Sequence, residues 1–231
     1  MRKRFQIALA VLLLVLAGVI AWQVLRVPEP VYDGKPANYW IRRSGETYEG
    51  SDFGRTGYFP KTDSNAIPYL VRALHRRESR FSKAYLRIWL RSPAWIKNRS
   101  PTPVIAEQVR RSTAEALGRM RDTGKAAIPA LCDALRDDES MDVRIWAAMS
   151  LGKLGKGDEQ ATMALFEVLA NKDSPIQRYA AGALAEIGTS ARIAVPVLIE
   201  CLSCDDMPLR IAASDALKQI DPEAATRAGV K

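Results

Sequence analysis

The sequence repeats itself with a period of 33 to 34 residues over its C-terminal half. The segment 143–155, VRIWAAMSLGKLG, recurs at 176–188 and 209–221, and in a more divergent form at 109–121. Self-similarity at a fixed period of this length is typical of solenoids, in which each unit packs only on its neighbours. The repeat therefore predicts an array of stacked units in place of a single closed core.

Each copy carries apolar or small residues at its first, fifth, ninth and twelfth positions, a spacing that places them on one face of a helix. We expect the last three of these columns to be buried in the regular copies: Ala147, Leu151, Leu154, Ala180, Leu184, Ile187, Ala213, Leu217 and Ile220. A second apolar pattern precedes the copies and begins near a proline, as at Pro129 and Pro196, where a helix tolerates the missing N–H. The unit is thus a pair of helices, which cannot bury its apolar face alone.

These two patterns, IPxLxxAL and VRxxAAxxLGxLG, resemble HEAT repeats, specifically the short HEAT-like repeats named after phycobilisome lyases. The resemblance covers residues 66–222 and implies an all-α fold, a right-handed α-solenoid of stacked helix pairs. It also implies a non-catalytic scaffold for protein–protein interaction, whose partner the sequence does not identify. A phycobilin-lyase-like enzyme is an alternative that the same resemblance implies. Ankyrin and tetratricopeptide repeats share the period, but their signature residues are absent.

Residues 1–26 have the composition of an N-terminal membrane anchor. Met-Arg-Lys-Arg is followed by an apolar run, and residues 5–25 are long enough for one transmembrane helix. The basic start favours a cytoplasmic N-terminus, so we expect a single-pass protein whose repeats lie outside the cytoplasm, in the periplasm of a bacterial cell. A cleaved signal peptide, followed by secretion, is the alternative.

The remaining segments are less regular. Residues 27–65 are rich in proline, glycine and aromatic residues and predict a linker followed by a cap on the array or a ligand-binding loop. Residues 66–92 are expected to form a first helix pair with Leu86 and Leu90 in core columns, and the prolines up to Pro103 then interrupt the period. The array resumes near Val104, and 223–231 is expected to be a polar, frayed tail.

Charge is distributed unevenly along the repeats. Residues 72–121 hold 13 Lys or Arg against 3 Asp or Glu, whereas 122–231 hold 12 against 17. The basic segment is therefore a candidate site for a polyanion, with anionic lipid headgroups beside the anchor favoured over nucleic acid; an ordinary solvated face is the alternative. The candidate residues are Arg76, Arg80, Lys83, Arg87, Arg91, Arg110 and Arg111. If the helical phase continues past Glu78, the first five of them, from Arg76 to Arg91, form one stripe.

No residue pattern specifies a reaction. Arg110, Arg144 and Arg210 recur at one repeat position, with Gln177 replacing arginine once, and they resemble arginines that form ladders with acidic groups in HEAT proteins. His75 is the only histidine, and the CxxC of Cys201 and Cys204 lacks the two further ligands of a zinc site. These cysteines and Cys132 are interpreted as buried structural thiols, and a Cys201–Cys204 disulfide is the alternative if the repeats lie outside the cytoplasm. The sequence predicts no catalytic residue, no metal site and no cofactor.

Overall fold

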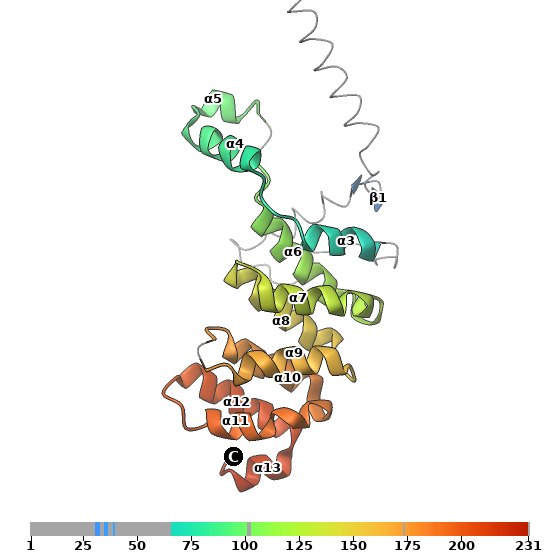
Figure 1. Ribbon diagram of the computed structural model, residues 1–231, viewed down its shortest axis with the longest axis vertical. Helices are drawn as coiled ribbons and strands as arrows, with labels where there is room; N and C mark the ends of the chain where they lie inside the picture. Colours follow the sequence, from blue (N-terminus) through green and yellow to red (C-terminus); the bar gives the residue numbers. More distant parts are fainter. Residues whose placement is uncertain are drawn as a thin grey trace, which may run out of the picture.

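The computed structural model describes residues 31–32, 35–36, 39, 66–100, 103–172 and 174–230. From residue 66 onward the described chain is an all-α repeat solenoid, as the sequence predicted (Figure 1). The predicted transmembrane helix at 5–25 and most of the predicted linker and cap at 27–65 lie outside the described residues.

The solenoid consists of two layers of helices. The first helix of each pair belongs to one layer: α3 (Ile67–Leu74), α7 (Ile128–Asp137), α9 (Glu159–Ala170) and α11 (Val195–Cys201). The second helices form the other: α6 (Ala106–Arg119), α8 (Met141–Leu154), α10 (Gln177–Ile187) and α12 (Met207–Ile220). The most extensive contacts run between successive second helices, α6 to α8, α8 to α10 and α10 to α12.

Local sequence determines where these helices begin. A proline stands in the first turn of α3, α7 and α11, where no intrahelical N–H donor is lost. Side-chain oxygens of Ser140, Asp158 and Asp206 cap α8, α9 and α12 by accepting from a backbone N–H three residues on. Short 3-10 segments, η3 (Arg121–Ala127) and η4 (Gly188–Ala194), connect a second helix to the next first helix.

The core lies between the two layers and between successive helices of the same layer. All nine predicted core residues of the regular copies are at most 1% exposed. Small residues allow the second helices to approach closely. A Cβ placed on Gly152 of α8 would lie 2.8 Å from the Cα of Ala183 in α10, so this contact has no room for a larger side chain. At this position the backbones of neighbouring repeats therefore pack directly on one another.

The assignment of 66–92 as a helix pair is wrong. The partner of α3 is α6, and α4 (Arg80–Arg91) and α5 (Ala94–Lys97) are inserted between them, projecting from the array (Figure 1). Leu90 is 61% exposed and Leu86 is only half-buried, so neither occupies a core column. The first repeat, α3 with α6, is therefore complete, and the insertion separates its two helices in the sequence.

Both ends of the described array also differ from expectation. The tail contains a helix, α13 (Pro222–Arg227), whose Ala224 and Ala225 are buried against the last repeat, where a frayed segment was expected. At the N-terminal side, β1 (Val31–Tyr32) pairs antiparallel with β2 (Lys35–Pro36), with Val31 opposite Pro36, within the predicted extended linker.

Candidate functional site at the N-terminal end of the array

The recurring Arg or Gln of the second helices binds backbone carbonyls near the end of the first helix in its own repeat. Arg144 Nε donates to the carbonyl of Leu135 over 2.9 Å, and Gln177 Nε2 donates to that of Leu169 over 2.7 Å. Arg210 donates to the carbonyls of Cys204 and Asp205. Carbonyls at helix ends lack intrahelical donors, so these side chains satisfy acceptors that would otherwise need water. The predicted structural role is confirmed, but the acceptors are mainly carbonyls instead of an acidic ladder.

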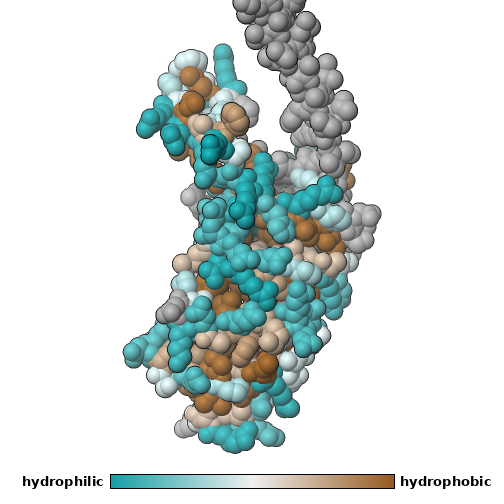
Figure 2. All heavy atoms as spheres, viewed as in Figure 1, coloured by the Kyte–Doolittle hydropathy of each residue, from teal (hydrophilic) through white to brown (hydrophobic). Residues whose placement is uncertain are grey.

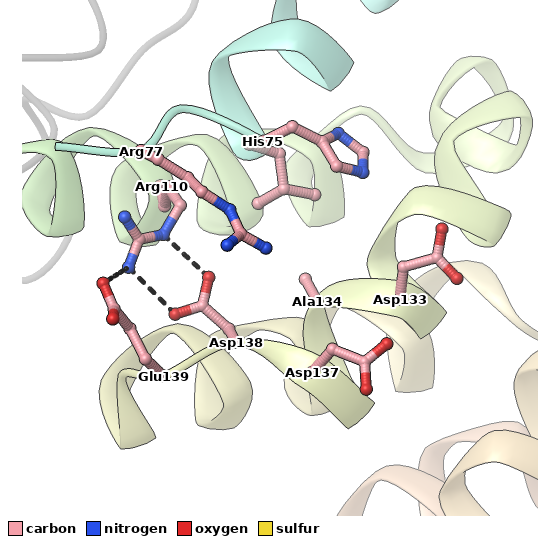
Figure 3. A pocket seen from close by; sticks show the side chains of 9 residues that line it. His75, Arg77, Arg110, Asp133, Ala134, Asp137, Asp138 and Glu139 are labelled. Carbon is pink, nitrogen blue, oxygen red and sulfur yellow. Dashed lines mark hydrogen bonds and ion pairs between the residues drawn. The ribbon is translucent and has the colours of Figure 1, made fainter. Parts of the chain in front are cut away.

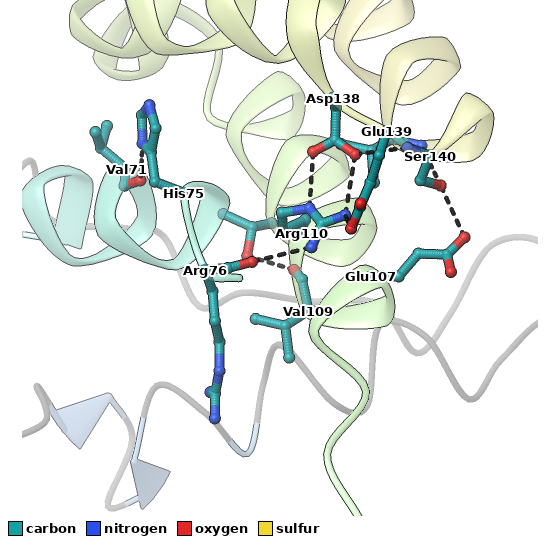
Figure 4. A network of polar contacts seen from close by, with 11 residues as sticks. Val71, His75, Arg76, Glu107, Val109, Arg110, Asp138, Glu139 and Ser140 are labelled. Atoms are coloured by element: carbon teal, nitrogen blue, oxygen red, sulfur yellow. Dashed lines mark hydrogen bonds and ion pairs between the residues drawn. The ribbon is translucent and has the colours of Figure 1, made fainter. Parts of the chain in front are cut away.

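Arg110 extends this pattern into an ion-pair network (Figure 4). Its Nη1 donates to the Arg76 carbonyl over 2.9 Å, while Nε and Nη2 donate to the two carboxylate oxygens of Asp138 over 2.7 and 3.0 Å. The side chains of Arg110 and Asp138 are only 4% and 9% exposed. Such a two-pronged pair has the geometry that an arginine fork and a carboxylate prefer. The network fastens α3 and α6 to the loop between α7 and α8.

A polar cleft of about 330 Å³ lies beside this ion pair, between the C-terminal ends of α3 and α7 (Figure 3). His75 and Arg77 approach it from the α3 side, and Asp133 and Asp137 lie one turn apart on α7. Pockets for small molecules are predominantly apolar, with only a few polar groups. This cleft, lined by charges of both signs, is better suited to the polar rim of a macromolecular contact.

The basic candidate residues do not form a single stripe. Helix α3 ends at Leu74 and α4 begins at Arg80, so Arg76 lies in a non-helical connection. Lys83, Arg87 and Arg91 share a face of α4 and are exposed, as is Arg80 at its first turn. Arg110 is buried in the ion pair and Arg111 is half-buried on α6, and we therefore remove Arg110 from the exposed cationic surface. Four of the five exposed candidate cations therefore lie on α4, and the fifth, Arg76, precedes it.

The thiols and the histidine do not form a nucleophilic site. Burial raises the pKa of the Cys132 thiol to about 11, and burial also raises the pKa of Cys201, so both stay protonated near neutral pH. His75 is exposed, with Nδ1 2.8 Å from the Val71 carbonyl oxygen at the end of α3. In the part of the chain that the structure describes, no group of three or more His, Cys, Asp or Glu is able to hold a metal ion.

Stacked helix pairs, whose core packs both within and between repeats, define an all-α repeat solenoid. Residues 106–185 match the HEAT repeats, and residues 176–204 match the PBS lyase HEAT-like repeat. The chain thus contains HEAT and PBS lyase HEAT-like repeats, as its two helix patterns predicted.

Comparison with solved structures yields an engineered protein that is 24% identical to this chain, with a TM-score of 0.41. The match covers 71% of this chain and 85% of the engineered one. No curated protein matches the chain.

Proposed function

We propose that this protein is a non-catalytic HEAT scaffold that binds a protein partner along its array while residues 5–25 anchor it in a membrane. The observation that carries the proposal is that the recurring polar side chains form their hydrogen bonds within the array itself. The recurring arginines, the glutamine and the Arg110 network serve the array itself, so what the solenoid offers a partner is its extended outer surface. Extended surfaces of stacked repeats are what solenoid proteins use for binding.

A phycobilin-lyase-like activity receives no support from the site. A tetrapyrrole is a large, mostly apolar ligand, and sites for such ligands are enclosed and predominantly apolar. The cleft beside Arg110 is polar, and the small residues between α8 and α10 bring those helices into direct contact. Binding of anionic lipid through residues 72–121 is proposed as an additional function, and α4 contributes four exposed cations to it.

The anchor is proposed from the composition of residues 5–25 and the basic residues that precede them. Among the described residues, Gln177–Cys201 is also long and apolar enough to cross a membrane. It comprises α10, η4 and α11, whose Ala180, Leu184 and Leu198 are buried in the solenoid. We therefore assign that stretch to the array and the membrane span to the N-terminal segment.

Two measurements on the full chain test the anchor and its orientation. Alkaline extraction is expected to leave the protein in the membrane fraction, because an apolar helix of this length remains in the bilayer without help from surface charges. A reporter active only outside the cytoplasm, fused after Lys231, is expected to be active, and a reporter active only inside the cytoplasm is not. A shorter chain released in soluble form would instead establish a cleaved signal peptide.

A further inference from the structure

The inserted hairpin, formed by α4 and α5, contributes no buried residue to the core of the described array. No residue of α4 is buried by the described parts of the chain, and the hairpin projects beyond the repeats (Figure 1). It is held together locally: the Ser79 hydroxyl caps α4, and Lys97 Nζ donates to the Leu90 carbonyl over 3.0 Å and lies over the Trp89 ring. A helix of about 12 residues is only marginally stable in water by itself. A surface that covers one of its faces would therefore stabilise it.

One exposed face of α4 is apolar. Phe81, Tyr85 and Ile88 follow the i, i+4, i+7 spacing of a single helical stripe. Phe81 is 87% exposed and Ile88 65% exposed, and Trp95 on α5 is 68% exposed. Figure 2 shows apolar and charged side chains gathered together over this projecting region. Large apolar side chains exposed as a set indicate a contact surface, whereas scattered ones do not.

The cations lie directly beside this stripe. On a helical projection at 100° per residue, Arg80, Lys83, Arg87 and Arg91 occupy one arc next to the arc of Phe81 and Ile88. From 76 to 99 the chain carries eight Lys or Arg and a single acidic residue, Glu78. A short helix with an apolar face, an adjacent basic face and almost no carboxylates has the composition of an element that lies in a membrane interface.

We propose that the α4–α5 hairpin inserts its apolar face into the interface of an anionic lipid bilayer, with its lysines and arginines against the headgroups. This inference rests on the membrane-anchored scaffold proposed above. Nucleic acid would account for the cations but not for Phe81, Ile88 and Trp95 exposed beside them. The hairpin also belongs to the first repeat, the repeat that follows the predicted anchor in the chain, so one bilayer would engage both.

The test uses the full chain reconstituted into vesicles of phosphatidylcholine, with or without phosphatidylglycerol. An environment-sensitive fluorophore is attached at Ala84→Cys, an exposed position of α4, in a Cys204→Ser background that leaves only buried thiols. We expect its emission to shift to the blue, and to be quenched by nitroxide-labelled lipid, only when phosphatidylglycerol is present. Raised salt should reverse both effects, because the attraction of exposed charges is screened. The matched label at Ala170→Cys, exposed at the end of α9, should stay in water.

Two charge variants complete the test. Changing Lys83, Arg87 and Arg91 together to Gln should weaken attachment of the hairpin by up to about 150-fold, since each cation near an anionic surface contributes about fivefold. Changing Lys153, Lys156 and Lys172 together to Gln removes the same charge elsewhere and should have no such effect. Circular dichroism checks that both variants keep the wild-type helicity.

Different outcomes would contradict the proposed anchor and the proposed insertion of the hairpin. A chain retained after alkaline extraction with a label at position 84 that remains in water in both vesicle types would overturn the hairpin proposal and leave the anchor in place. A chain released by alkali whose label still enters anionic vesicles would support the hairpin and contradict the anchor. An equal response to neutral and anionic vesicles, or no loss in the α4 triple variant, would also overturn the assignment.

Discussion

Replacing Leu184 by alanine is expected to lower the free energy of unfolding by about 2–5 kcal/mol. Leu184 is fully buried on α10, the second helix that packs against both α8 and α12. Removing its isobutyl group leaves a cavity in the array, and repeats are coupled through such nearest-neighbour interfaces. Chemical denaturation of a fragment that starts at residue 27, followed by circular dichroism, measures the loss.

The matched control is Ile211→Ala on α12, an apolar side chain of similar size that is 53% exposed. Because little of its contact surface is buried, we expect a change within about 0.5 kcal/mol. A loss as small as this for Leu184→Ala would show that the column assigned to the core is wrong.

Replacing Arg110 by alanine is expected to cost about 3–5 kcal/mol, because it leaves the carboxylate of Asp138 buried without its partner. The same change also removes the donor to the Arg76 carbonyl at the end of the first repeat. The measurement is again denaturation of the fragment from residue 27.

Two further variants separate the effect of burying an unpaired charge from the effect of losing an ion pair. Arg136→Ala removes an exposed ion pair with Glu167 and should cost no more than about 1 kcal/mol. The double replacement Arg110→Met with Asp138→Leu should recover much of the lost stability, since apolar side chains of similar volume often replace a buried pair at little cost. A double variant no more stable than Arg110→Ala would mean that the carbonyl contact, not the unpaired carboxylate, dominates.

The regular repeats were predictable because local periodicity determines their core. Leu151, Leu184 and Leu217 occupy the same position in successive copies. The helical spacing of the apolar positions within each copy places them on one buried face. The inserted hairpin was missed because Leu86 and Leu90 mimic the spacing of core positions. The signal that would have revealed it is the distance of 61 positions between Leu70 and Leu131, which share a column and differ by far more than one repeat.

The candidate site was predictable only in part. The exposure of Lys83, Arg87 and Arg91 followed from their helical spacing, but the loss of helical phase before Arg80 did not. The recurring arginine position indicated a structural role, yet its acceptors are backbone carbonyls, which every residue carries and no sequence pattern distinguishes. The partner of Arg110 was equally hidden, because Asp138 lies 28 positions away in the next repeat.

Photo-crosslinking in the native membrane tests the central claim most directly: the array binds a protein while the hairpin faces lipid. A photoreactive residue is placed in the full chain at Met141 of α8, Ile211 of α12 or Ile88 of α4, all exposed apolar positions. The account predicts a discrete protein adduct from at least one of the two array positions, its loss when the array is destabilised by Leu184→Ala, and a lipid adduct without a protein adduct from Ile88. Protein adducts from Ile88 alone, with none from the array, would contradict it.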